Sequence, residues 1–219
     1  MAGALYRACT RSDAGPACAR TCRRGGAPAR ARKTVLVVGD SLSAEYGLKR
    51  GAGWVALLAA RVAQHPQISA TVVNASISGD TTSGGRSRLP ALLKQHRPSI
   101  VILELGGNDA LRGLPLAMTR DNLDTMARDA KSSGAKVVIA GMQVPPNYGR
   151  KYGDEFAALF ASVAKSESAA LVPFLLKGIA DGPQAEALFQ PDRIHPSASA
   201  HPMILDNVWP VLEPLLAAR

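Results

Sequence analysis

Cysteine is scarce in this 219-residue chain and confined to its N-terminal end. The three cysteines are Cys9, Cys18 and Cys22, and none follows residue 22. The rest of the chain therefore forms no internal disulfide and has no cysteine nucleophile. A metal clip at these three is the alternative, but their spacing is loose and no histidine lies nearby, so we expect no metal site.

Long apolar runs are missing as well. No stretch approaches the ~20 apolar residues that a membrane-spanning helix needs, so we expect no stable membrane insertion. Residues 1–33 also lack the apolar core of a secretory signal. They are rich in alanine, arginine and glycine without apolar periodicity, which predicts a disordered leader or a start codon assigned too far upstream. We expect one domain at residues 34–219. If the start codon is as given, we expect the protein in the cytoplasm.

Positive charge is abundant but unevenly placed. The formal net charge is +9, and residues 1–33 contribute +7 of it. Residues 34–219 carry 18 basic and 16 acidic side chains and are nearly neutral. A basic face is therefore not predicted, and we expect no nucleic-acid partner.

Short apolar runs alternate with amphipathic stretches from residue 34 onwards. Strands are predicted at residues 34–38, 70–74, 99–104, 136–140 and 170–174. Helices are predicted at residues 53–65, 86–96, 119–132, 153–166 and 197–216, the last broken near Pro210. Strands separated by helices pair in parallel through right-handed crossovers. The pattern predicts an α/β fold, a three-layer α/β/α sandwich with a flavodoxin-like five-stranded parallel sheet.

A serine follows the first predicted strand at its carboxyl end. The apolar run at 34–38 leads directly into Gly39-Asp40-Ser41-Leu42-Ser43. Open α/β sheets place their sites at this edge, so Ser41 is a candidate nucleophile. The G-x-S-x-G motif is absent, which argues against the α/β-hydrolase fold.

A serine nucleophile needs a base, and only four histidines are available. His65 and His96 each end a predicted helix, where their charge suits the helix dipole. His201 falls in the last helical region and is expected on the surface or as a cap. His195 follows Asp192 by three residues in a loop held by prolines. A carboxylate at this spacing can fold back onto the imidazole Nδ1–H and leave Nε2 free to accept a proton.

Two loops with glycine follow the second and third predicted strands. Gly79 can bring its backbone N–H close to a ligand, although an ordinary turn glycine is the alternative. Asn108 follows two glycines and can aim its side-chain amide into the site. Backbone N–H groups and asparagine amides are the usual donors to the oxyanion of acyl transfer, so both residues are candidate donors.

The order of these motifs resembles the SGNH, or GDSL-type, hydrolase family over residues 34–216. The segments at 73–81, 89–96, 104–109 and 146–150 are similar to its bacterial acyl-CoA thioesterase I group, also described as lysophospholipase and arylesterase. The resemblance implies that Ser41 is the nucleophile, His195 the base and Asp192 its orienting acid. It also implies an oxyanion hole made by the backbone N–H groups of Ser41 and Gly79 and the side chain of Asn108.

One residue departs from the pattern of this family. The group usually has Asp-Gly-Ile-His-Pro, and Arg193 replaces the glycine. If that position requires a positive φ, we expect strain at Arg193. The family also implies a periplasmic or secreted location, although the usual signal segment is missing.

These observations predict a monomeric serine hydrolase that acts on small-molecule or lipid acyl esters and thioesters without a cofactor. By the resemblance, apolar loop residues would line an acyl groove, although they could equally pack the loops: Leu111, Leu114, Val144, Pro145 and Tyr148. Two alternatives are a carbohydrate acetyl esterase and a non-catalytic binding protein on the same scaffold.

Overall fold

One parallel sheet organises residues 32–218, the part of the chain that the computed structural model describes. Its strand order is β2-β1-β3-β4-β5. The strands are β1 (Lys33–Gly39), β2 (Ala70–Asn74), β3 (Ile100–Glu104), β4 (Lys136–Ala140) and β5 (Ala170–Val172). This is the flavodoxin-like order, with its switch point between β1 and β3, and the predicted fold class is confirmed. Residues 1–31 of the predicted leader, with the three cysteines, lie outside the described residues, whereas Lys33, the last residue of that leader, is the first residue of β1.

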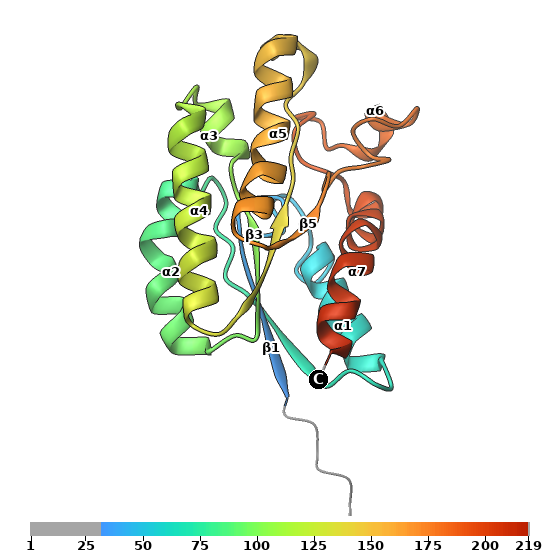
Figure 1. The fold of residues 1–219 in the computed structure, drawn as a ribbon. Helices are drawn as coiled ribbons and strands as arrows, with labels where there is room; N and C mark the ends of the chain where they lie inside the picture. The colour runs from blue at the N-terminus through green and yellow to red at the C-terminus, as the bar shows by residue number, and fades with distance from the viewer. Residues whose placement is uncertain (1–31, 219) are drawn as a thin grey trace, which may run out of the picture. The chain divides into compact units, whose positions relative to one another are not determined.

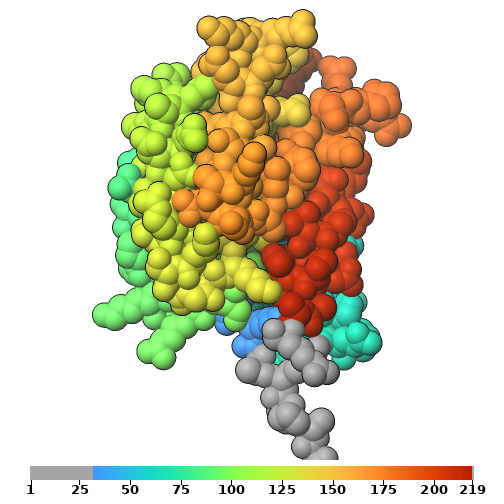
Figure 2. All heavy atoms as spheres, viewed as in Figure 1, coloured from blue at the N-terminus to red at the C-terminus, as the bar shows by residue number. Residues whose placement is uncertain are grey.

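Helices cover both faces of the sheet. Figure 1 shows α1 (Trp54–Gln64) and α7 (His201–Ala217) on one side, with α2 (Thr82–His96) and α4 (Leu116–Ser132) on the other. The helix α5 (Arg150–Ser166) packs beside α4, and in Figure 2 the side chains of α4, α5 and α7 cover most of the sheet. The shorter helices are α3 (Gly107–Leu111) and α6 (Ala185–Leu188). None of the helices within residues 32–218 is both long enough and apolar enough to cross a membrane.

The apolar run of β1 divides between two cores. Val35 and Val37 belong to the core shared with α1 and α7, and Leu36 and Val38 to the core on the opposite face. All four side chains are fully buried. A central parallel strand buried on both faces needs such a continuous apolar run, which is why the sequence predicts a strand here.

The predicted break near Pro210 is wrong. Helix α7 continues through Pro210 and Pro214. Both prolines lie on the exposed face, where water can solvate the carbonyls that lose an N–H donor. The opposite face is held by buried side chains such as Val208 and Leu212.

The histidines outside the predicted site have structural roles. His65 follows the last residue of α1, and His96 is the last residue of α2, as expected. His201 is buried, and its Nδ1 accepts a hydrogen bond of 3.0 Å from the backbone N–H of Trp54, the first residue of α1. The expected capping role is therefore present, whereas the expected surface position is wrong.

Candidate active site

Ser41, His195 and Asp192 form a continuous chain of hydrogen bonds. Ser41 stands just beyond β1, and its Oγ lies 2.9 Å from Nε2 of His195. Nδ1 of His195 lies 2.6 Å from Oδ2 of Asp192. Because an ionised carboxylate can only accept, Nδ1 carries the proton and Nε2 is left to accept one from Ser41. The structure thus brings together the three side chains that the sequence singled out.

Asp192 is held by its own segment of backbone. Its Oδ1 accepts hydrogen bonds from the N–H groups of Ile194 at 2.9 Å and His195 at 3.0 Å. Hydrogen bonding, above all from the backbone N–H of His195, lowers the pKa of Asp192 to about 2. The carboxylate therefore stays ionised and keeps the imidazole oriented even though this loop is largely exposed.

The residue that departs from the family pattern adopts a left-handed backbone. Arg193 has φ of +56°, a conformation that favours glycine. The expected strain is thus present at this position. The side chain of Arg193 reaches Glu186 at 3.1 Å, but both side chains are at least 80% exposed, so this ion pair adds little.

An aromatic ring that the sequence did not predict here lies against His195. The ring centroids of Tyr46 and His195 are 4.3 Å apart. The side-chain amide of Gln190 donates to the carbonyls of Tyr46 at 2.9 Å and Pro196 at 3.1 Å, which joins this tyrosine to residues 189–196, the segment that carries Asp192 and His195. A tyrosine five residues after the nucleophile gives no sequence signal of this contact.

Two backbone N–H groups are available as oxyanion donors. Within residues 32–218, the N–H groups of Ser41 and Gly79 have no acceptor. Gly79 has φ of +79°, and a Cβ there would contact only Nη2 of Arg112, at 3.9 Å. Gly79 therefore faces open space, where a reacting carbonyl group can approach its N–H.

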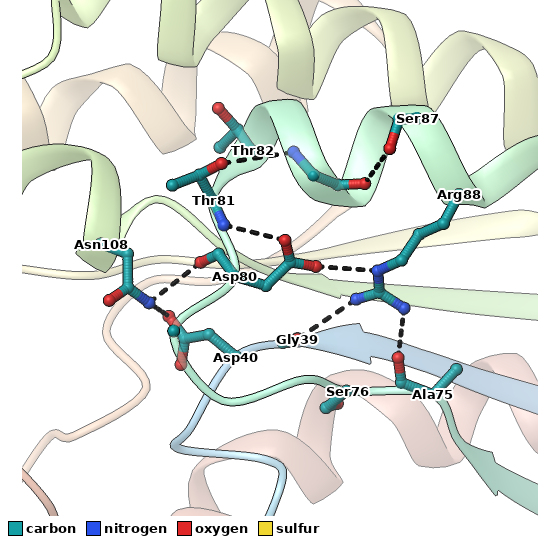
Figure 3. A network of polar contacts seen from close by, with 12 residues as sticks. Gly39, Asp40, Ala75, Ser76, Asp80, Thr81, Thr82, Ser87, Arg88 and Asn108 are labelled. Carbon is teal, nitrogen blue, oxygen red and sulfur yellow. Dashed lines mark hydrogen bonds and ion pairs between the residues drawn. The ribbon is translucent and has the colours of Figure 1, made fainter.

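The third expected donor is already engaged. Nδ2 of Asn108 donates to Oδ2 of Asp40 at 3.0 Å and to the carbonyl of Asp80 at 2.9 Å, as Figure 3 shows. An amide nitrogen has two hydrogens, and both have acceptors here. Asn108 can donate to an oxyanion only by sharing one of them.

Two buried acids, Asp40 and Glu104, lie next to Ser41. Oε2 of Glu104 accepts hydrogen bonds from the backbone N–H of Asp40 at 3.2 Å and from Oγ of Ser43 at 2.6 Å. Both acids are at most 2% exposed. Gly39 permits this approach, because a Cβ at that residue would lie 2.5 Å from Oε2 of Glu104. The glycine of the serine motif therefore makes room for a carboxyl group.

Burial favours the protonated form of both acids. Burial, and then the charge of Asp40, raises the pKa of Glu104 well above its ordinary value. Burial raises the pKa of Asp40 to about 6, against hydrogen bonds that stabilise its charge. No sequence pattern indicated this pair, because Glu104 was predicted only as the last residue of a strand. Among residues 32–218, no group of three or more His, Cys, Asp or Glu side chains could hold a metal ion.

The predicted groove residues are only partly brought together. Val144 and Pro145 line a cavity of about 250 Å³ beside α5. Tyr148 instead stacks on Tyr152, with ring centroids 6.2 Å apart. Leu111 is 46% exposed on α3, and Leu114 is half-buried after it. The cavity does not include Ser41, so an acyl groove that joins all five residues remains a prediction.

The sequence and the fold of this chain are similar to those of known lipases, acylhydrolases and esterases. Residues 37–202 match the model of the GDSL-like Lipase/Acylhydrolase family. The chain is 50% identical over 186 residues to Esterase TesA of Pseudomonas aeruginosa, which covers 85% of this chain and 90% of that protein. It is 43% identical over 188 residues to the Thioesterase 1/protease 1/lysophospholipase L1 of Escherichia coli K12, covering 86% of this chain and 87% of that protein. A crystal structure of TesA matches with a TM-score of 0.81 at 50% identity, over 84% of this chain and all of that one.

Proposed function

The chain belongs to the GDSL-like lipase/acylhydrolase family, and we infer that it cleaves acyl esters and thioesters through an acyl-enzyme on Ser41. It is an enzyme that hydrolyses esters, so the alternative of a non-catalytic binding protein is set aside. The observation that carries the proposal is the hydrogen-bonded chain from Ser41 through His195 to Asp192. A pure binding protein has no use for a nucleophile, a base and an orienting acid in this arrangement.

The first half-reaction forms the acyl-enzyme. Ser41 Oγ attacks the carbonyl carbon while its proton passes to Nε2 of His195. Asp192 stabilises the imidazolium that results. The tetrahedral intermediate collapses, the bond to the leaving oxygen or sulfur breaks, and the leaving group takes the proton from His195.

The second half-reaction releases the acid. A water molecule gives a proton to Nε2 of His195 and attacks the acyl carbon. The second tetrahedral intermediate expels Ser41 Oγ, which regains the proton from His195. The free N–H groups of Ser41 and Gly79 donate to the oxyanion in both halves, and Asn108 joins them by sharing the hydrogen that now points at Asp40 or Asp80.

The substrate is an ester with an apolar group. Within residues 32–218, the exposed large hydrophobic side chains all lie within five positions of a proposed site residue: Tyr46, Ile77, Leu111 and Ile194. Each is about half exposed, which favours an apolar acyl or aryl group at the site over an acetylated carbohydrate. The five predicted groove residues belong to this proposal. A series of p-nitrophenyl esters from two to twelve acyl carbons tests it, because a carbohydrate acetyl esterase loses activity beyond the shortest chains.

Replacement of the nucleophile tests the reaction itself. Ser41→Ala should lower kcat for p-nitrophenyl butyrate by roughly 10⁶-fold, since loss of a triad serine removes covalent catalysis. The variant should also fail to label with a fluorophosphonate probe. Ser133→Ala, at the end of α4, is the matched control and should behave as the wild type. Activity of Ser41→Ala near that of the control contradicts the proposal.

Location, domain limits and assembly complete the proposal. Residues 34–219 are the hydrolase domain, the protein is monomeric, and the family favours a periplasmic or secreted location. The N-terminal sequence of the protein purified from cell fractions of its native host tests the domain limit and the location. Light scattering on the purified protein tests the monomeric state.

A further inference from the structure

One arginine joins three backbone segments next to the nucleophile. Arg88 lies on α2, and its side chain is 19% exposed. Its Nε donates to Oδ2 of Asp80 at 2.8 Å, and its two terminal nitrogens donate to the carbonyls of Ala75 and Gly39. Figure 3 shows the guanidinium group between these three acceptors. It therefore links the end of β1 to both ends of the loop that follows β2.

Two of these segments carry a group of the proposed reaction. Gly39 precedes Ser41 by two residues, and Asp80 directly follows Gly79. The carbonyl of Asp80 also accepts the amide of Asn108. The position of Arg88 is thus coupled to the nucleophile and to two of the expected oxyanion donors.

The loop after β2 depends on this link in its second half. Its first half is tied to β1 by backbone hydrogen bonds, from Ala75 N–H to the Val37 carbonyl and from Ile77 N–H to the Gly39 carbonyl. In the half that holds Gly79, the Asp80 N–H donates to the Ile77 carbonyl and Arg112 donates to the Gly79 carbonyl. The side chains of Arg88 and Asn108 add the direct links from Asp80 to the end of β1. Of these two side chains, Arg88 is charged and Asn108 is neutral. The positive guanidinium group of Arg88 is opposite in charge to the carboxylate of Asp80.

We propose that Arg88 is a positioning residue that fixes the distance between the Gly79 N–H and Ser41, so that it acts on the transition state and not on substrate binding. This inference rests on the proposed oxyanion role of Gly79. The guanidinium group suits the task because its planar fork donates in several directions at once. A lysine ammonium at the end of a flexible stem cannot reach the carboxylate and both carbonyls in the same way.

The test compares two arginines on the same helix. Arg88→Met and Arg88→Lys are measured beside Arg86→Met, whose arginine donates to Oδ1 of Asn122 on α4 at 3.1 Å. Both Arg88 variants should lower kcat for p-nitrophenyl butyrate by about 100-fold with KM within twofold, since a displaced catalytic group costs about this much. Their affinity for butylboronic acid, which forms a tetrahedral adduct with serine, should weaken by the same factor. Arg86→Met should match the wild type in all three measurements.

Several outcomes overturn the inference. Wild-type kcat in Arg88→Met refutes it, as does a rise in KM at unchanged kcat or unchanged boronic acid affinity. If Arg88→Met fails to fold, Arg88→Lys, which keeps the charge, decides the matter by the same kinetic criteria. Failure of the proposed function is a separate result, because Ser41→Ala would then stay active whatever the Arg88 variants do.

Discussion

The two sides of Ser41 are built in opposite ways. The base segment, residues 189–196, is short and largely exposed, and Asp192 and His195 support each other across three positions. The buried network, which comprises Asp40, Ser43, Asp80, Arg88, Glu104 and Asn108, joins residues that lie up to 68 positions apart. The base segment depends on local backbone geometry. The buried network depends on the correct assembly of β1, β3 and α2.

This difference predicts how each side responds to substitution. Removal of one group from the base segment should change the chemistry and leave the fold intact. Removal of one group from the buried network leaves a desolvated partner behind, so stability and its pH dependence should change as well.

Among substitutions on the two sides of Ser41, the largest effect is expected from Asp192→Asn in the base segment. An asparagine here favours the imidazole tautomer whose Nε2 carries the proton, and that tautomer cannot accept the proton of Ser41. We expect kcat to fall by about 10⁴-fold while the thermal unfolding midpoint at pH 7 changes little. Steady-state kinetics and calorimetry on the same preparation measure both.

The exposed Asp181→Asn is the matched control for loss of a surface carboxylate. A large drop in the unfolding midpoint of Asp192→Asn alone would mean that the base segment is not independent of the fold.

The next effect concerns the pH dependence of stability in the buried network. Between the ordinary pKa of 4.5 and its raised value, Glu104 keeps its proton in the folded chain and loses it in the unfolded chain. The free energy of unfolding should therefore fall as pH rises, by about 1.4 kcal/mol per pH unit from this group. Glu104→Gln removes that contribution, because an amide does not titrate. Urea unfolding of both proteins at pH 5, 6, 7 and 8 gives the two slopes.

Asp40 titrates in both proteins, so only the difference between the slopes belongs to Glu104. Glu155→Gln, on the exposed face of α5, removes a surface carboxylate and should keep the wild-type slope. Equal slopes in Glu104→Gln and the wild type would show that Glu104 is ionised in the folded chain.

The same contrast explains what the sequence could predict. Local patterns predict the fold class and the proposed triad, because the apolar run lies directly before Ser41 and Asp192 lies three residues before His195. Glu104 sits in a strand and Arg88 in a helix, and neither position signals a partner. Their contacts with Asp40 and Asp80 exist only once β1 and β3 pair in register and α2 packs against them. Tyr46 against His195 was missed for the same reason.

The smallest effect is expected at Arg193, where the base segment carries backbone strain. A left-handed conformation costs a non-glycine residue about 1–2 kcal/mol, and glycine gives back about 0.5–1 kcal/mol through its greater freedom in the unfolded chain. Arg193→Gly should therefore stabilise the protein by about 0.5 kcal/mol with kcat within twofold of the wild type, as urea unfolding and kinetics measure. Arg193→Ala loses the same exposed ion pair but keeps the strain, so it should give no gain. If the alanine variant proved as stable as the glycine variant, relief of backbone strain at this φ would not explain the gain in stability.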